Sequence, residues 1–220
     1  MLFSNEQVAR VLNEQFEPVW ESVRPVPMIH IDFGDGRTVT RTLHGNIASY
    51  VCAADGVVID ILPGIYTASA YSSGLTQIRT FAATLARSLQ PQRATKLQQH
   101  HQQQVALIRN NQIKPNGARR ADMGKGVIER RVERAIGGNV AIADVNGTVP
   151  PGFGLGTWQA LAEDTRVNET QRRLQIHEKL ASGPLSRPGQ IKSWLYKTVL
   201  NSDLDDPYLG LGDVLAASDV

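Results

Sequence analysis

An Asp-Gly pair at positions 55 and 56 separates two apolar runs, and it restricts the fold more than any other part of the chain. The runs, 49–53 and 57–62, are rich in residues that suit strands. Glycine takes positive φ without steric cost, so this arrangement predicts a tight β-hairpin. The second run is interrupted only by Asp60, which predicts a strand covered on both faces. A Pro-Gly pair then ends it, because proline donates no hydrogen bond to a sheet.

Two amphipathic helices are predicted to flank this hairpin. Apolar residues recur at helical spacing after a capping-box pattern at Ser4 and Gln7, and again over 67–89. The apolar residues of 19–23 predict a further strand, which we expect to pair in the same sheet. Residues 29–43 alternate in polarity around a Gly-Asp-Gly turn and predict a second hairpin.

The second half of the chain is predicted to be mainly helical. A polar, exposed helix is expected around the run QQHHQQQ at 98–104, and amphipathic helices over 157–182 and 186–200. Between them, 113–156 holds a short basic helix among Gly- and Pro-rich stretches, which predict a linker and a loop. The tail 207–215 is too apolar for a free end, so we expect it to dock on the chain or on a partner.

Composition excludes several classes of function. The single cysteine excludes an intrachain disulfide, a Cys-x-x-Cys redox pair and a multi-cysteine zinc site within this chain. The net charge of +2 offers no bulk attraction to nucleic acid. No apolar run approaches the ~18 residues that span a bilayer, and Met1 is not followed by a secretory signal.

The stretch FSNEQVARVLNEQFEPVWESV from Phe3 resembles the later half of the active-site helix, and the strand after it, in thioredoxin-like proteins. A little-characterised thioredoxin-like family of bacterial proteins is further resembled by the segments VWESVRPVP, DFGDG, LHGNIASYVC and ILPGIY, and by DLDDPYLGLG at 203–212. The hairpin looks like the last hairpin of a thioredoxin-like fold, followed by its closing helix. The resemblance implies an α/β fold (an α+β sandwich): an incomplete or degenerate thioredoxin-like domain over 1–90, a helical and Gly/Pro-rich linker region over 91–156, and a helical C-terminal region over 157–220.

The family resemblance also implies a redox dithiol at the start of the first helix and a cis-proline before the penultimate strand. No residue matches the dithiol, and the cis-proline loop corresponds to Asn46, Ile47 and Ala48. We therefore expect a redox-inactive binding or scaffold module whose partner is a protein, with no cofactor and with its oligomeric state open. The alternative is a thiol-disulfide oxidoreductase whose catalytic N-terminal segment precedes this chain. We expect a longer product with an upstream strand, in which case the protein is exported or periplasmic; otherwise it is cytoplasmic.

Other candidate sites each have a structural interpretation. Cys52 is a candidate redox thiol, but its place in an apolar strand favours a buried structural cysteine. His100 and His101 are neighbours and point about 100° apart on a helix, so a solvated surface is favoured over a metal site. His30, His44 and His177 have no Cys or carboxylate at a recognised ligand spacing.

Polar clusters in the second half are interpreted in the same way. An acidic group is expected to form a helix-terminating turn rather than a cation site; it consists of Asp203, Asp205 and Asp206. The glycine-rich residues 152–156 are expected to form a flexible connection rather than a phosphate cradle.

A mixed group on one helix is interpreted as a solvated face; it consists of Asp164, Asn168, Glu169, Arg172, Arg173 and His177. A basic group lacks the interleaved aromatic residues of a nucleic-acid site; it consists of Arg119, Arg120, Lys125, Arg130, Arg131 and Arg134.

Overall fold

The computed structural model describes residues 2–24, 28–32, 34–36, 38–42, 47–113 and 155–206. Within these ranges the chain combines helices and antiparallel strands, so the mixed α and β class is confirmed. The predicted linker with its basic cluster, residues 152–154 of the glycine-rich connection and the C-terminal tail lie outside the described residues. Leu155 and Gly156 of that connection already belong to helix α5 (Leu155–Val167), so the prediction of a flexible connection is wrong for these two residues. The proposed domain boundaries stay a prediction.

The central hairpin forms as predicted. Strands β3 (Ala48–Cys52) and β4 (Val58–Pro63) pair antiparallel, with a register shift at the end of β3. Gly56 has φ of 81°, and its N–H donates to the carbonyl of Ala53 at 2.9 Å. This left-handed conformation is the one that the turn requires, and glycine adopts it without steric cost.

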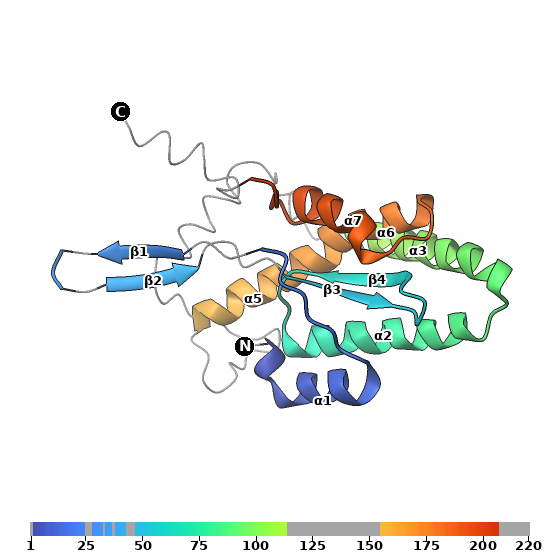
Figure 1. Cartoon of the computed structure of the whole chain (residues 1–220), viewed down its shortest axis with the longest axis horizontal. Coiled ribbons are helices and arrows are strands. Elements are labelled where there is room, and N and C mark those ends of the chain that lie inside the picture. Colours follow the sequence, from blue (N-terminus) through green and yellow to red (C-terminus); the bar gives the residue numbers. More distant parts are fainter. Residues whose placement is uncertain are drawn as a thin grey trace.

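Helices cover both faces of this hairpin (Figure 1). On one side, Ile59 and Leu62 of β4 share a core with α1 (Glu6–Gln15) and α2 (Ala68–Ala86). On the other side, Val58 and Ile61 share a core with α6 (Arg173–Ser182) and α7 (Pro188–Trp194). Every residue of β4 is buried, which confirms the prediction that this strand is covered on both faces.

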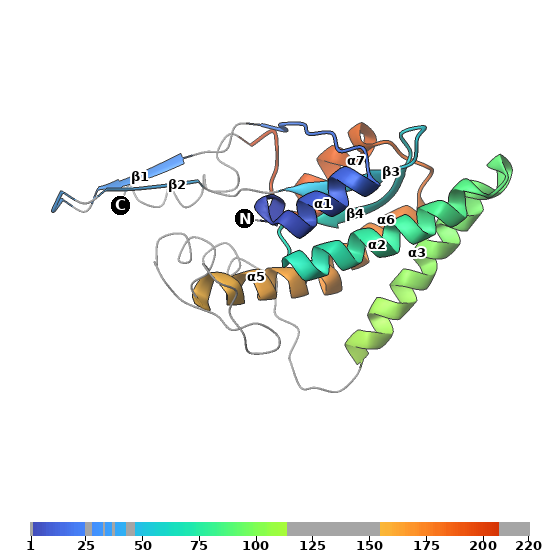
Figure 2. The ribbon, with the colours of Figure 1, turned by 90° about the horizontal axis from the view of Figure 1, so that it is seen from below.

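The two helices on the first face begin at side-chain caps. Asn5, and not Ser4, caps α1: its side-chain oxygen accepts from the backbone N–H of Gln7 and Val8, so the predicted capping box is wrong by one residue. Thr67 caps α2 by accepting from Ala70. In Figure 2, α1 and α2 lie close together on this face.

The predicted strand at 19–23 does not form. Residues 17–24, here called the strap, run in irregular conformation after Phe16. Val19 and Trp20 are 91% and 85% exposed, and only Val23 packs against the second core cluster. The strap is fixed from its far end, where Nη1 of Arg24 donates to the carbonyl of Asp206 at 2.7 Å. This anchor holds the segment without a strand partner.

The second predicted hairpin is confirmed. Strands β1 (Met28–Asp32) and β2 (Thr38–Thr42) pair antiparallel in full register around the Gly-Asp-Gly turn. Gly34 and Gly36 both have positive φ, and the Asp32 side chain accepts from the N–H of Gly34. Figures 1 and 2 show this hairpin extending away from the helices and the central sheet.

Helix α3 (Gln90–Ile113) contains the polar run and is mostly exposed, as predicted, with two buried residues among those described. Pro91 lies in its first turn, where the missing N–H costs no helical hydrogen bond. Leu97 and His101 are buried, and α3 packs along α6. In the described part of the chain, no helix combines the length and apolarity needed to cross a membrane.

The C-terminal helices follow the predicted order. Helix α5 (Leu155–Val167) runs into η2 (Asn168–Arg172), a turn of π-helix, and then into α6. The chain turns at Gly183 and Pro184, and α7 begins with Pro188 at its first position and continues into η3 (Leu195–Val199), a second π turn. Inserted π turns are frequent near functional sites, and η2 directly precedes the helix that supplies the polar cluster described next.

Candidate functional site

The polar group inside β4, Asp60, is the starting point of a buried cluster. Its side chain is enclosed between the strand and α6, and the residue is 1% exposed. Oδ1 accepts from the N–H of Ile61 at 2.7 Å, and Oδ2 pairs with Nη2 of Arg173 at 2.5 Å. A buried carboxylate requires such partners, because burial of an isolated charge is strongly unfavourable.

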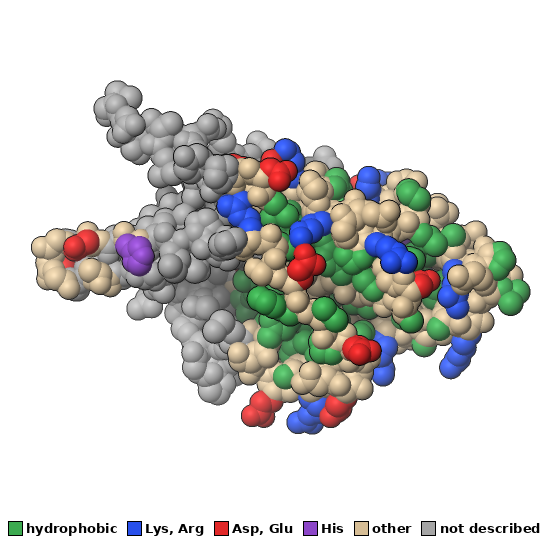
Figure 3. All heavy atoms as spheres, viewed as in Figure 1, with side chains coloured by type: hydrophobic (Ala, Val, Ile, Leu, Met, Phe, Trp, Pro, Cys, Tyr) green, Lys and Arg blue, Asp and Glu red, His purple; other side chains and the backbone are tan. Residues whose placement is uncertain are grey.

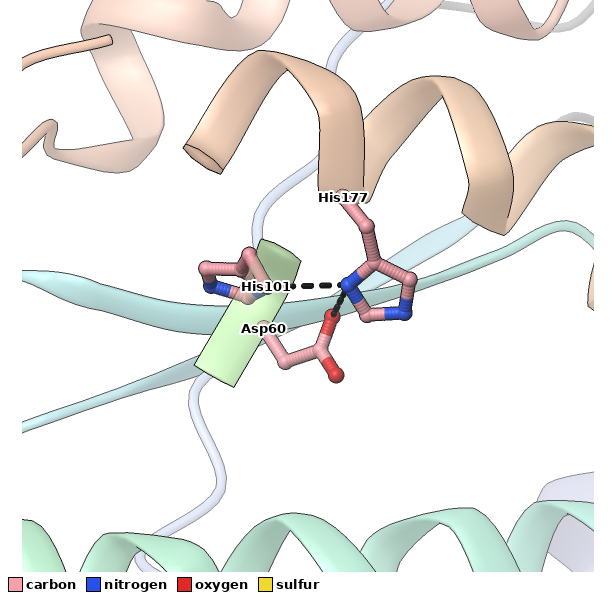
Figure 4. A group of neighbouring side chains, drawn as sticks. All are labelled: Asp60, His101 and His177. Carbon is pink, nitrogen blue, oxygen red and sulfur yellow. Dashed lines mark hydrogen bonds and ion pairs between the residues drawn. The ribbon is translucent and has the colours of Figure 1, made fainter. Parts of the chain in front are cut away.

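Two histidines from different helices meet beside this carboxylate. His101 of α3 and His177 of α6 are 0% and 1% exposed, and their Nδ1 atoms lie 2.9 Å apart. Nδ1 of His177 lies 3.9 Å from Oδ1 of Asp60. Figure 4 shows the three side chains converging from the strand and the two helices. Within the described residues neither Nε2 atom has a hydrogen-bond partner of good geometry, although the backbone of Ile59 lies close enough to act on the His101 ring.

Helical spacing on α6 brings Arg173 and His177 to the same site. The two residues are four apart, so they lie on one face of the helix, which is turned toward β4. Glu169, one turn earlier, lies 3.6 Å from Nη1 of Arg173 with its side chain 41% exposed. The guanidinium is therefore placed between a buried and a half-exposed carboxylate.

A neighbouring polar seam fixes the start of this segment. Asn168 donates from Nδ2 to the carbonyl of Ile65 at 2.8 Å and accepts from Nη1 of Arg172 at 2.6 Å. A Cβ at Gly64, where φ is 78°, would stand 3.0 Å from both side chains. Only glycine suits this position, and it lets η2 approach the end of β4 closely.

Burial and charge set the protonation states of the cluster. Burial alone would raise the pKa of the Asp60 carboxyl, but Arg173 and the two histidines outweigh it and lower that pKa. Burial lowers the pKa of His101 to about 4 and that of His177 to about 3, against partial opposition from Asp60. At neutral pH the cluster therefore holds an anionic carboxylate, a cationic guanidinium and two neutral imidazoles.

This donor set is chemically suited to hold a cation. One ligand atom from each of Asp60, His101 and His177 lies within 4.8 Å of the others. Neutral imidazoles and a carboxylate are transition-metal ligands. The same groups could also act as a base, but their exposures of 0–1% exclude direct contact with a substrate.

The expectation of a solvated surface for the histidines is wrong. His101 is fully buried, and His100 is half-buried and stacked on Phe81 with ring centroids 3.7 Å apart. Arg173 and His177, predicted to lie on a solvated helix face, are 7% and 1% exposed. A charged residue within an apolar strand was the available signal, because a buried Asp60 needs a cationic partner.

The two predicted sites near β3, Cys52 and the described residues of the loop 46–48, lie outside this cluster. Cys52 is exposed, which contradicts the predicted buried position, and partial burial together with Asp55 raises the pKa of its thiol. Of the predicted cis-proline loop, Asn46 lies outside the described residues; Ile47 accepts from the N–H of Gly64, and Ala48 pairs with Pro63.

The remaining candidates stay separate from the cluster. Asp203 pairs with Lys197 and accepts from the N–H of Asp205, as expected of a helix-terminating turn. His30 is exposed on β1. His44 lies outside the described residues.

Comparisons with known proteins add no assignment. A scan against family models, a search of curated proteins and a search of solved structures each find no match to this chain.

Proposed function

We propose that this chain is a thioredoxin-like binding or scaffold module that recognises a protein partner and performs no thiol exchange with its own residues. The resemblance of the hairpin region is supported by an antiparallel hairpin followed directly by a helix that packs on it. The absence of thiol exchange is supported by the single cysteine, whose raised pKa disfavours the reactive thiolate.

The observation that carries a binding role is the presentation of Trp20. This indole is 85% exposed at the middle of the strap, next to Val19, which is 91% exposed. The strap is held on one side by Phe16, which packs against the first core cluster, and on the other by Val23 and Arg24. Exposed tryptophans on pre-ordered segments are typical anchors of protein interfaces.

The surroundings of the strap suit a protein partner. Glu21 pairs with Lys192 of α7 at 2.7 Å, which adds a polar contact beside the exposed indole. Figure 3 shows apolar side chains gathered over the middle of one face, between scattered charged groups. The strap and β3 lie on this face in Figure 1, which has the same view. Interfaces combine an apolar centre with such a polar rim.

The closed state of the polar cluster also favours binding over catalysis. Asp60, His101 and His177 lie inside the core, so a substrate would reach them only after local unfolding. The groups with the strongest potential for chemistry in the described part of the chain are thus separated from solvent.

Site-specific crosslinking tests the role of the strap. A photoreactive phenylalanine analogue replaces Trp20 in one variant and Leu89, which is 68% exposed between α2 and α3, in a control. We expect position 20 to crosslink one defined protein and position 89 not to do so. With that protein purified, Trp20→Ala should weaken binding at least about thirty-fold, as for interface anchors that contribute ~2 kcal/mol, whereas Leu89→Ala should not. Equal crosslinking at both positions would refute the role of the strap.

An insulin-reduction assay tests the absence of thiol exchange. We expect the chain to show the same rate as its Cys52→Ser variant. A rate that depends on Cys52 would favour the oxidoreductase alternative.

A further inference from the structure

We propose that Asp60, His101 and His177 form a binding site for one divalent transition-metal ion, with Zn²⁺ as the best fit. The proposal is independent of the strap and of thioredoxin-like ancestry. It rests on three donors that come from β4, α3 and α6 and that are all fully buried.

The distances suit a shared ion. At metal–ligand distances of about 2.0–2.2 Å, neighbouring ligand atoms stand roughly 3 to 3.5 Å apart. The two Nδ1 atoms are 2.9 Å apart, and Nδ1 of His177 is 3.9 Å from Oδ1 of Asp60. The two imidazoles therefore have nearly the separation of adjacent ligands, and the carboxylate must move closer to become the third, since the three donors span up to 4.8 Å.

The hydrogen bonding of the imidazoles leaves both Nδ1 atoms directed at one point. One N–H lies between the two rings, so the pair holds a single N–H···N hydrogen bond. With an ion bound, both Nδ1 atoms become ligands, this hydrogen bond is lost, and the proton that the rings shared moves to Nε2 of the same ring. The exchange replaces one hydrogen bond with two metal–ligand bonds.

Charge around the site is compatible with a cation. The charged groups that face it are Asp60, Glu169 and Arg173, so two carboxylates surround one guanidinium. Arg173 pairs with Oδ2 of Asp60, and Oδ1, which accepts from the N–H of Ile61, has its second lone pair for His177 or an ion. Arg173 would thus orient the ligating carboxylate, as hydrogen-bonded outer partners do in metal sites.

The enclosure of the site points to a structural ion. The three donors are shielded from solvent, so no substrate reaches the ion in the folded chain. Zinc is normally four-coordinate, so the fourth ligand is expected to be an enclosed water. An ion here would join the central strand to α3 and α6, in addition to the ion pair that already links Asp60 to α6. We expect it to enter while the chain folds or during local opening.

Metal titration of the full chain, purified without a histidine tag and treated with EDTA, tests the proposal. Co²⁺ is added to the native chain and, separately, during refolding from urea. We expect one equivalent to bind with visible d–d absorption, Zn²⁺ to displace it, and Zn²⁺ to raise the melting temperature. Paramagnetically shifted proton signals from two imidazoles would identify the ligands in the unaltered chain.

Variants of neighbouring histidines give a matched control. His101→Gln and His177→Gln should each weaken Co²⁺ binding at least a hundred-fold, whereas His100→Gln, one residue away, should leave it unchanged. Absence of stoichiometric binding by the unaltered chain under both loading conditions would overturn the proposal. Co²⁺ binding that persists in folded His101→Gln would also overturn the proposal, because the ion would then lie elsewhere. If this variant does not fold, the imidazole proton signals of the unaltered chain show whether two histidines bind the ion.

Discussion

Removal of Arg173 should destabilise this protein more than removal of any exposed arginine. The Arg173 and Asp60 side chains are 8% and 2% exposed, so Arg173→Met would leave a carboxylate buried without its cation. Loss of one partner from a buried ion pair costs about 3–5 kcal/mol. The second partner, Glu169, is half-exposed and adds little. We therefore expect the free energy of unfolding to fall by about 3–5 kcal/mol.

Urea denaturation in EDTA, followed by circular dichroism, measures this loss. For a chain of this size a slope of about 2–3 kcal/mol/M is expected, so the midpoint should fall by roughly 1–2 M. The matched control is Arg166→Met, which removes an exposed pair with Glu163 whose side chains are 53% and 45% exposed. That change should cost at most about 1 kcal/mol.

A double variant separates the buried charge from lost packing. Replacing both partners, as in Asp60→Leu with Arg173→Met, removes the uncompensated carboxylate and should recover much of the stability, because apolar pairs often replace buried ion pairs without loss. The reasoning is refuted if Arg173→Met costs no more than Arg166→Met. It is also refuted if the double variant has a lower free energy of unfolding than Arg173→Met alone.

Three further predictions concern other parts of the chain. Metal-free protein should lose stability as pH falls from about 6.5 toward 4, because histidines of the unfolded chain protonate near pH 6.5 while the pKa of His101 in the fold is about 4. His101→Gln should flatten this part of a plot of unfolding free energy against pH. An unchanged plot would contradict the burial of His101. Gly56→Val should lower stability by about 1–3 kcal/mol in thermal or urea melts, because φ of 81° strains a β-branched residue, whereas Gly189→Ala, with open space around it, should have a far smaller effect. Cys52 should react with a thiol reagent in the native state, because it is exposed, but more slowly than a free thiol at pH 7, because its pKa is raised; protection comparable to that of a core residue would contradict its exposure.

Local patterns in the sequence were sufficient for the elements that depend on neighbouring residues. The Asp-Gly turn, the apolar run of β4 and the helical spacing of α2 each act over a few residues, and all three are found where predicted. The strand predicted at 19–23 failed because a strand needs a partner from elsewhere in the chain. Apolar residues alone do not supply one, and here Arg24 anchors the segment to the turn near Asp206 instead.

The polar cluster depended on tertiary structure. His101 and His177 are 76 positions apart and come from different helices, and both join a carboxylate in the central strand. No spacing rule relates residues so distant, and each histidine sits in a polar stretch that by itself indicates a solvated helix. The sequence determined that Asp60 lies in an apolar strand and therefore needs a partner. Only the packing of α3 and α6 decided which residues meet it, because burial depends on which helix faces are turned toward the sheet.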